Sequence, residues 1–188
     1  MRIIAGEFKG RTLKTITGPG YRPAMSKVRQ AVFSMLESRL GSLEGLRVLD
    51  LFAGSASLAF EAISRGAAHA TCVENNGKAE NIIAQNAESL GLESGRCRVI
   101  TEDVSKALRK RAPVAFDLIF IDPPYALDVL ASTAKPLVNN GWLSEQAVVC
   151  AEVERHAALD PEKLFLPLAL DTDRTYGQTR ILLWSSVE

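Results

Sequence analysis

The sequence is poor in cysteine and histidine, which excludes the common metal sites and disulfide frameworks. Its 188 residues include three cysteines, Cys72, Cys97 and Cys150, and two histidines, His69 and His156. The cysteine spacing fits neither a zinc site nor a redox pair, and neither histidine has a cysteine or a second histidine at ligand spacing. We therefore expect buried free thiols in a reducing compartment and no bound metal.

The sequence also lacks a long apolar run and a secretion signal. Asp50, Asp117 and Asp122 interrupt the apolar stretches, so none approaches the roughly 18 uninterrupted apolar residues of a membrane span. Glu7 and Lys9 interrupt the N-terminal stretch, and no small-residue cleavage site follows it. With 47% hydrophobic and 23% charged residues, the composition is typical of one soluble domain. We expect a cytoplasmic monomer with no membrane partner.

The sequence has no net charge, because its 22 basic side chains balance its 22 acidic ones. The two signs are nevertheless unevenly distributed. Residues 1–30 contain seven basic side chains and one acidic one, whereas residues 31–188 contain 15 basic and 21 acidic ones. A basic N-terminal arm on an acidic body suggests an anionic partner such as a nucleic acid. A basic hairpin that only aids solubility is the alternative.

The N-terminal segment is expected to form a small β-hairpin. Short strands are predicted at residues 2–5 and 11–16, with glycines at the turn between them and a Gly-Pro-Gly stop after them. We treat residues 1–23 as an N-terminal β-hairpin arm, for which the charge suggests a nucleic-acid-binding role, and residues 24–188 as the main domain.

One helix is expected directly after this arm. Ser26 precedes apolar residues at the three-and-four spacing of a helix face, and Gly41 ends the pattern. The spacing predicts a helix of about four turns.

From Leu46 onward, short apolar runs alternate with amphipathic helices, which implies an α/β fold with parallel strands and helices on both faces of the sheet. Helices are predicted around residues 58–63 and 79–90, the second ended by Gly91. Two C-terminal runs have no helix-length segment between them and should form an antiparallel hairpin. The seven expected strands are residues 46–52, 70–73, 98–101, 116–121, 147–153, 167–171 and 180–185.

Small and acidic residues follow the first three of these strands, at the edge where open α/β sheets bind ligands. Small residues at positions 53–56 would let the backbone approach a ligand closely. Glu74, about twenty residues after Gly54, could accept hydrogen bonds from both hydroxyls of a ribose. One carboxylate of Glu102-Asp103 could receive an adenine amino group. A surface turn or a helix cap is the alternative for each acid taken alone.

The most specific motif is Asp122-Pro123-Pro124-Tyr125, directly after a buried strand. Two consecutive prolines restrict the backbone, so the Asp122 carboxylate and the Pro123 carbonyl point to one place. Two acceptors that hold the hydrogens of a base-conjugated amine favour the pyramidal geometry that frees its lone pair for attack. Tyr125 offers a face on which a base could stack. A plain Asp-Pro turn is the alternative.

These motifs together resemble the class I S-adenosylmethionine-dependent methyltransferases, and more narrowly the RsmD family of 16S ribosomal RNA guanine-N2 methyltransferases. The resemblance covers nearly the whole chain. It rests on Arg2-Ile-Ile-Ala-Gly, Lys9-Gly-Arg11, Arg22-Pro23, Val28-Arg29, Val48-Leu-Asp-Leu-Phe-Ala-Gly-Ser55, Glu61-Ala-Ile-Ser-Arg-Gly-Ala67, Asp122 to Tyr125 and Tyr176-Gly-Gln-Thr179.

The resemblance implies a Rossmann-like class I methyltransferase fold: a mostly parallel seven-stranded sheet, a C-terminal antiparallel hairpin and an N-terminal β-hairpin extension. It implies transfer of a methyl group from S-adenosylmethionine to the exocyclic N2 amine of one guanine, position 966 in the customary numbering of 16S rRNA, within a small-subunit particle. The implied cofactor-binding residues are Asp50, Phe52, Ala53, Gly54, Ser55, Glu74, Asn75, Asp103 and Val104. The implied catalytic residues are Asp122, Pro123, Pro124 and Tyr125. The expected RNA-binding residues of the basic segment are Arg11, Arg22, Lys27 and Arg29.

Some positions depart from the family pattern. Ala56 and Ala59 replace glycines that the family usually has, and Ala24 replaces a threonine after Arg22-Pro23. A methyl group at position 56 could crowd the cofactor, whereas Ala59 should improve the helix.

Three other functions compete with this interpretation. A nicotinamide dehydrogenase would need three spaced glycines, which Gly54 to Ala59 do not provide. A DNA or RNA amino-methyltransferase of other specificity keeps the chemistry, but a DNA enzyme normally needs a recognition insertion for which 188 residues leave little room. A non-catalytic RNA-binding protein that retains the fold is favoured by Ala56 and opposed by Glu74 and Asp122 to Tyr125.

Overall fold

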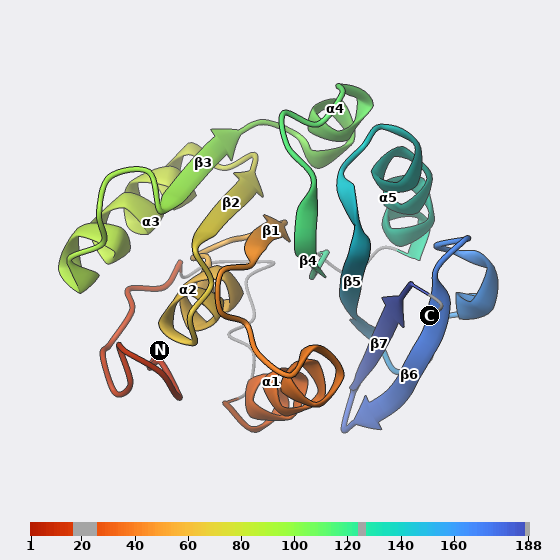
Figure 1. Ribbon diagram of the computed structural model, residues 1–188, viewed down its shortest axis with the longest axis horizontal. Coiled ribbons are helices and arrows are strands. Elements are labelled where there is room, and N and C mark those ends of the chain that lie inside the picture. Colours follow the sequence, from red (N-terminus) through yellow and green to blue (C-terminus); the bar gives the residue numbers. More distant parts are fainter. Residues whose placement is uncertain (17–25, 124–126, 187–188) are drawn as a thin grey trace.

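A mostly parallel seven-stranded sheet with helices on both faces forms the body of the protein (Figure 1). The computed structural model describes residues 1–16, 26–123 and 127–186, so Arg22, Pro124 and Tyr125 lie outside the described residues. The helices are α1 (Ser26–Leu40), α2 (Ser57–Ser64), α3 (Gly77–Leu90), α4 (Val104–Arg109), α5 (Leu127–Asn139) and a short 3-10 helix η1 (Pro161–Lys163). The strands are β1 (Arg47–Leu51), β2 (His69–Glu74), β3 (Cys97–Thr101), β4 (Phe116–Ile121), β5 (Leu143–Glu154), β6 (Ala169–Tyr176) and β7 (Thr179–Ser185).

The strand order is β3-β2-β1-β4-β5-β7-β6, which confirms the predicted fold class. Strands β1 to β5 pair in parallel, and β7 pairs antiparallel with both β5 and β6. The chain runs outward from β1 through β2 to β3 and then returns to place β4 on the other side of β1. Open α/β sheets bind ligands at such a reversal, beyond the carboxyl ends of the strands.

Alternate residues of the central strands pack on opposite faces of the sheet, so each strand is buried on both sides. In β4, Leu118 and Phe120 belong to the core that α1, α2 and α3 cover. Ile119 and Ile121 belong to the core that α4 and α5 cover. Apolar residues on both faces explain why β4 appears in the sequence as a nearly continuous apolar run.

Three helices have the ends that the sequence predicts, within a few residues. Helix α1 spans the expected residues, and Gly91 ends α3 in the left-handed conformation, with a φ of 70°. Helices α4 and α5 were not predicted one by one from the sequence. They lie in the β3–β4 and β4–β5 crossovers, and parallel strands require a connecting segment of this kind.

The N-terminal segment lies against α2. Arg2 and Thr12 form one isolated antiparallel bridge, so the two predicted strands are wrong in extent. The physical reason is that their backbone groups bind the helix: the amides of Ile4 and Ala5 donate to the Glu61 carboxylate over 2.8 and 3.0 Å. Three apolar side chains of the segment are buried in the core, namely Ile3, Phe8 and Leu13.

Gly6 makes this close approach possible. It has a φ of 81°, and a Cβ atom at this position would lie 1.7 Å from the backbone oxygen of Ser64. The neighbouring amide of Glu7 donates to that same oxygen over 2.7 Å. Position 6 therefore requires glycine.

Within the described ranges, no helix combines the length and the hydrophobicity needed to cross a membrane.

Candidate active site

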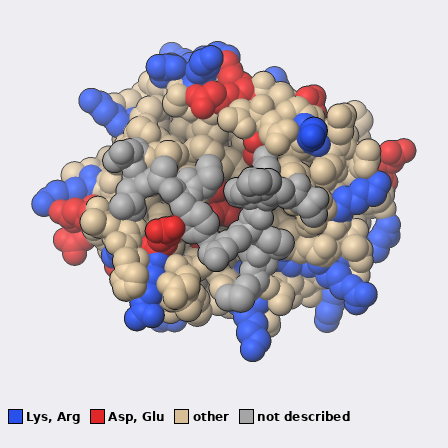
Figure 2. Space-filling view, turned by 180° about the vertical axis from the view of Figure 1, so that it is seen from behind, with Lys and Arg blue, Asp and Glu red and all other residues tan. Residues whose placement is uncertain are grey.

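Four carboxylates follow one edge of the sheet, at the carboxyl ends of four neighbouring strands. Glu74 ends β2, Asp50 is the penultimate residue of β1, Asp122 directly follows β4, and Glu152 lies near the end of β5. Asp50 and Glu74 are buried, and Asp122 and Glu152 are half-buried. In the view from behind, acidic side chains are visible near the centre, and both basic and acidic side chains lie around the outline (Figure 2). The sheet thus gathers four carboxyl groups where its strand order reverses.

The Glu74 carboxylate fixes the loop that follows β1. Its Oε2 atom accepts a hydrogen bond from the Gly54 amide over 2.9 Å, and its Oε1 atom accepts one from the Asn76 amide over 3.0 Å. Gly54 has a φ of 54°, in the left-handed region that favours glycine. A carboxylate has about four acceptor sites, so two remain available for a ligand.

Asp50 lies beneath the same loop and caps helix α2. Its side chain is 2% exposed, and Oδ2 accepts a hydrogen bond from the Ala59 amide over 3.2 Å. Ala56 precedes the helix and offers no side-chain cap, so Asp50 supplies the acceptor from β1. Burial raises the pKa of Asp50 to about 8, and the nearby Cys97 and Glu74 add to the effect.

The methyl group of Ala56 packs in the protein core, and its crowding of the cofactor stays a prediction. Ala56 and Ala59 are both fully buried and belong to the core between α2 and the sheet. Ala56 has a φ of 57°, which is costly for a residue other than glycine. Phe52 also has a positive φ, 60°. The loop from Phe52 to Ala56 is therefore held in a conformation that an unconstrained chain would avoid.

The residues expected near the ribose and the adenine differ in their exposure to solvent. Asp103 is exposed and caps α4, because its Oδ1 atom accepts hydrogen bonds from the Ser105 hydroxyl over 2.5 Å and the Lys106 amide over 3.1 Å. The Ser105 hydroxyl is also the main reason that the pKa of Asp103 is lowered. Val104 is buried in the core, and Asn75 is exposed beside Glu74. In this structure, the contacts of the Asp103 side chain are those of a helix cap, which is the alternative that the sequence left open for this residue.

Asp122 and Glu152 form a pair of carboxylates on one wall of a small cavity. The register pairs Ile121 with Ala151, so the next residues, Asp122 and Glu152, are neighbours. The cavity is lined by Arg29, Val32, Leu58, Phe120, Ile121, Asp122, Cys150 and Glu152. Burial raises the pKa of Asp122 well above its ordinary value, and the charges of Glu152 and Asp50 raise it further. Pro123 is half-buried beside this pair.

Sequence reasoning missed Glu152 as a site residue. Burial raises its pKa, while a hydrogen bond from the Thr179 hydroxyl to Oε1, 3.4 Å long, opposes the shift. An acidic residue inside the apolar run 147–153 was a usable signal, because burying a carboxylate costs free energy and such groups are common at functional sites.

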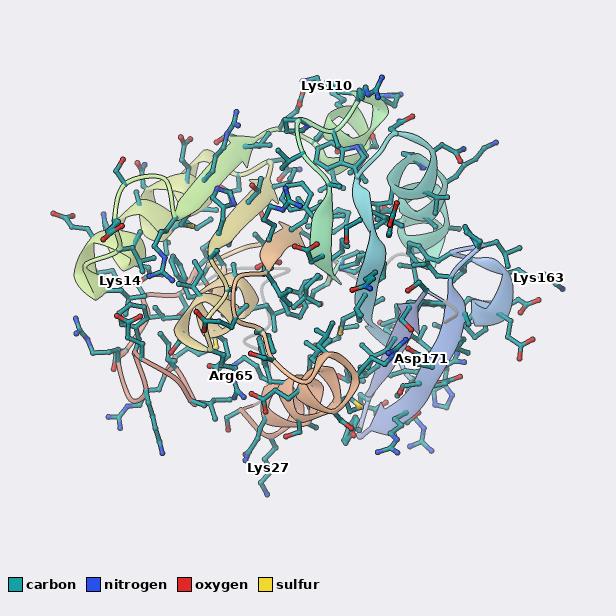
Figure 3. All side chains as sticks on the ribbon, viewed as in Figure 1. Lys14, Lys27, Arg65, Lys110, Lys163 and Asp171 are labelled. Atoms are coloured by element: carbon teal, nitrogen blue, oxygen red, sulfur yellow. The ribbon has the colours of Figure 1, made fainter. Side chains whose placement is uncertain are left out.

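The described basic residues that were expected to contact RNA differ from one another in their exposure to solvent. Arg11 and Lys27 are exposed, and the Lys27 side chain points away from α1 into solvent (Figure 3). The Arg11 guanidinium also donates to the backbone oxygen of Ser89.

Arg29 is buried, which argues against the predicted contact between this residue and RNA. It is 2% exposed, and its guanidinium donates to the Arg2 carbonyl and the Met1 sulfur. Its Nε atom lies 3.9 Å from the Glu61 carboxylate. Arg29 lies beside Val28 on α1 and is buried with Val28 and Val32, so its guanidinium binds groups of the protein instead of facing solvent.

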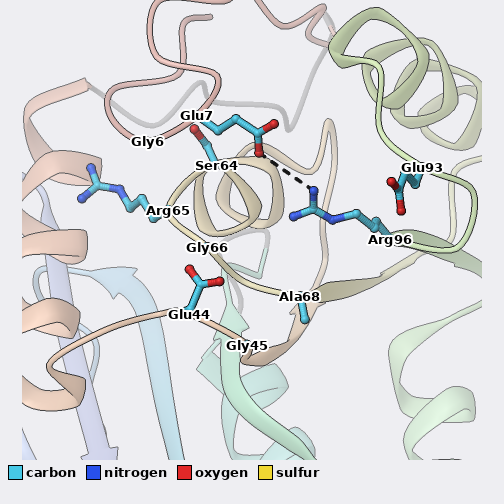
Figure 4. Close-up of a pocket in the computed structure, with 10 residues that line it drawn as sticks. All are labelled: Gly6, Glu7, Glu44, Gly45, Ser64, Arg65, Gly66, Ala68, Glu93 and Arg96. Carbon is cyan, nitrogen blue, oxygen red and sulfur yellow. Dashed lines mark ion pairs between the residues drawn. The ribbon is translucent and has the colours of Figure 1, made fainter.

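A second pocket, of about 650 Å³, lies away from these carboxylates (Figure 4). Gly45 and Ala68 line it just before β1 and β2, so it opens at the amino edge of the sheet. Arg96 forms an ion pair with Glu7 over 3.9 Å, and Arg65 forms one with Glu37 over 2.7 Å. Its arginines are thus already paired, and the pocket lies at the opposite edge of the sheet from Asp122. No group of three potential metal ligands occurs among the described residues.

Comparison with known proteins identifies the family. A family model described as Conserved hypothetical protein 95 matches residues 1–185. The chain belongs to this family, the RsmD family. Ribosomal RNA small subunit methyltransferase D of Escherichia coli (strain K12) is 33% identical over 154 residues, covering 82% of this chain and 75% of the relative. The protein of that name from Haemophilus influenzae is 32% identical over 160 residues, covering 85% and 81%.

Solved structures agree with this assignment. The solved structure of the Escherichia coli protein yhhF, provisionally named a methyltransferase, matches with a TM-score of 0.84 at 30% identity. The match covers 99% of this chain and 97% of that chain. The Thermus protein TTHA0928 has a TM-score of 0.74 at 30% identity, with 100% and 99% covered. This RsmD-family chain is an S-adenosylmethionine-dependent methyltransferase.

The carboxyl edge of the sheet fits this cofactor. Gly54 has the left-handed backbone conformation that lets a ligand approach closely, and the Glu74 carboxylate keeps acceptor sites beyond its two backbone hydrogen bonds.

Proposed function

We propose that this RsmD-family methyltransferase transfers a methyl group to the exocyclic N2 amine of a guanine in 16S ribosomal RNA, at position 966 in the customary numbering. The observation that carries the proposal is the carboxylate of Asp122 at the carboxyl end of β4, beside a cavity and adjacent to Glu152. The names of the relatives support a ribosomal RNA of the small subunit as the substrate.

The loop after β1 and the end of β2 would hold the cofactor. Gly54 and its neighbours Phe52, Ala53 and Ser55 would lie against its methionine part, with Asp50 beneath them. Glu74 would accept the ribose hydroxyls, with Asn75 beside it. Asp103 and Val104, at the start of α4, would border the adenine. When bound, S-adenosylmethionine supplies a methyl group on a positively charged sulfur.

Asp122 would act on the amine that receives the methyl group. Its carboxylate and the Pro123 carbonyl would each accept one hydrogen of the N2 amine, which turns the nitrogen lone pair toward the methyl carbon. The Asp122 carboxylate would stabilise the positive charge that develops on the amine nitrogen as it takes the methyl group. The Asp122 carboxylate would accept one amine proton and later release it to solvent, so that the product is neutral N2-methylguanine. Tyr125, after Pro124, would stack on the flipped base.

The N-terminal basic residues would bind the RNA backbone. Arg11, Arg22 and Lys27 are the proposed phosphate contacts, and Arg29 is left out because it is buried. Residues 1–23 would thus serve as an RNA-binding arm, and residues 24–188 as the methyltransferase domain. A monomer acting in the cytoplasm on a small-subunit particle fits this function.

A methyl-transfer assay with base mapping tests the proposal. The enzyme is incubated with labelled cofactor and with naked 16S rRNA, assembling particles or complete small subunits, and the modified base is then identified. We expect label on one guanine N2. Label on another base would replace the proposal by an amino-methyltransferase of other specificity. Cofactor binding without transfer to any of these substrates would favour a non-catalytic RNA-binding protein.

A further inference from the structure

We infer that Glu152 determines base specificity: its carboxylate accepts the N1–H of the target guanine, beside Asp122, which accepts the N2 amine. This inference rests on the proposed function and assigns a residue that reads the base. The geometry that supports it is the juxtaposition of two carboxylates from neighbouring parallel strands on one cavity wall.

The side chains of Asp122 and Glu152 point to the same face of the sheet. Side chains alternate along a strand, so Asp122 shares a face with Phe120, and Glu152 shares one with Cys150. All four line the same cavity. Paired residues on adjacent strands have side chains about 5 Å apart, which suits two adjacent groups on the edge of one base.

The protein holds Glu152 in place from the other side. The Thr179 hydroxyl donates to its Oε1 atom, and Thr179 begins β7, which pairs with β5. The turn between β6 and β7 is itself attached, because the Arg155 amide donates to the Gln178 carbonyl over 2.8 Å. A rigidly placed acceptor discriminates better than a mobile one.

Stability alone does not explain Glu152. Among the described residues it takes part in no ion pair, since the pairs of this region join other residues, such as Arg29 with Glu61. Placing a half-buried carboxylate next to Asp122 costs folding free energy through desolvation and like-charge repulsion. Such a cost is common where a group is positioned for a ligand.

The chemistry of the base decides what this pair can read. Guanine presents three donor hydrogens side by side, one on N1 and two on N2, and two carboxylates match them. Adenine and 2-aminopurine present a bare N1 acceptor, which a carboxylate repels. A site built to receive a hydrogen bond rejects a base that lacks the donor much more strongly than a shape-only pocket would.

Base replacement at the proposed target separates the two residues' roles. Small-subunit RNA is prepared with guanine, inosine or 2-aminopurine at that position, and kcat/KM for methyl transfer is measured. Inosine keeps N1–H but lacks the N2 amine, and 2-aminopurine keeps the amine but lacks N1–H. We expect no transfer to inosine, and at least about tenfold slower transfer to 2-aminopurine than to guanine.

The variant Glu152→Gln should lower kcat/KM on guanine by about tenfold or more, because it loses a charge-assisted hydrogen bond. It should affect 2-aminopurine much less, since the amide can donate to a bare N1, so the preference for guanine narrows. Its thermal midpoint should equal or exceed that of the wild type, whereas a purely structural role would lower it. Glu145→Gln, exposed near the start of the same strand, is the matched control and should leave the preference unchanged.

The outcomes are distinguishable. Transfer to inosine, or none to guanine, by the wild type would overturn the proposed function itself. Equal transfer to guanine and 2-aminopurine by the wild type would overturn the role of Glu152 even if the variant failed to fold. An unchanged guanine preference in a folded Glu152→Gln protein would overturn it as well.

Discussion

The carboxylate of Glu74 accepts the backbone amide of Gly54 over a distance of 2.9 Å, which joins the end of β2 to the loop after β1. The sequence places these residues twenty positions apart, and the parallel pairing of β1 with β2 brings them together. One side chain therefore both shapes the loop and presents acceptors to a ligand at the same edge.

Replacing Glu74 should weaken cofactor binding. Glu74→Ala removes the acceptors for the ribose hydroxyls and releases the Gly54 amide, so we expect a loss of about 1.5 to 3 kcal/mol, or tenfold and more in affinity. Calorimetric titration with S-adenosylmethionine measures this. Glu44→Ala, at the opposite edge of the sheet, is the control and should bind like the wild type. Equal affinity in both variants would show that the ribose lies elsewhere.

Arg29 should matter for stability. Arg29→Met leaves the buried Glu61 without one of its cations and the Arg2 carbonyl without its donor, which should cost roughly 3 kcal/mol in the free energy of unfolding. Arg65, 2.9 Å from Glu61, keeps the loss from being larger. Lys27→Met on the same helix is exposed and should change stability by less than about 0.5 kcal/mol. Urea denaturation compares them, and equal midpoints would contradict the buried role of Arg29.

Asp50 should make the cofactor-free protein less stable as the pH rises. Its folded pKa of about 8 lies above that of an unfolded aspartate, so between these values the folded state binds the proton more tightly. Stability therefore falls as pH rises toward 8, by at most about 1.4 kcal/mol per pH unit for this group.

Asp50→Asn tests this sign. Asparagine keeps an acceptor for the Ala59 amide and does not ionise, so the variant should gain thermal stability over the wild type progressively between pH 5 and about 8. Asp160→Asn, at an exposed site, should follow the wild-type profile. Parallel profiles for Asp50→Asn and wild type would show that Asp50 does not titrate in this range.

The exposed basic residues near the N-terminus should contribute to RNA affinity through salt-dependent contacts. The double variant Arg11→Ala, Lys27→Ala should weaken RNA binding and reduce the slope of log affinity against log salt by up to about 1.4 for two single-stranded contacts. Cofactor affinity should not change. The pair Lys110→Ala, Lys163→Ala removes equal charge from the other side of the molecule, away from Lys14 and Lys27 (Figure 3). Equal slopes for the two double variants would leave the N-terminal residues without a specific role.

Local patterns in the sequence predicted most of the elements. The boundaries of α1 and β4 were given by apolar spacing and by flanking residues, which act within a few positions. The alternation of strands and helices predicted the parallel sheet because crossover geometry allows few other arrangements.

Features that depend on distant pairing were not predictable in the same way. Arg29 looks like a surface charge in sequence, but it is buried because Glu61 of α2 and the carbonyl of Arg2 meet it. Glu152 becomes a neighbour of Asp122 only through the β4–β5 register. The two predicted N-terminal strands do not form over their predicted length for a related reason. Glu61 of α2 supplies the acceptors that a partner strand would have supplied.

The role of Asp122 is tested most directly by single-turnover methyl transfer with Asp122→Asn, at saturating cofactor and small-subunit RNA. The amide keeps the size of the side chain but cannot stabilise positive charge on the attacking amine, so the account predicts a rate at least about a hundredfold lower. Cofactor affinity and thermal midpoint should not fall, because the loss belongs to the transition state. A folded Asp122→Asn enzyme that modifies the same guanine at the wild-type rate would contradict the account.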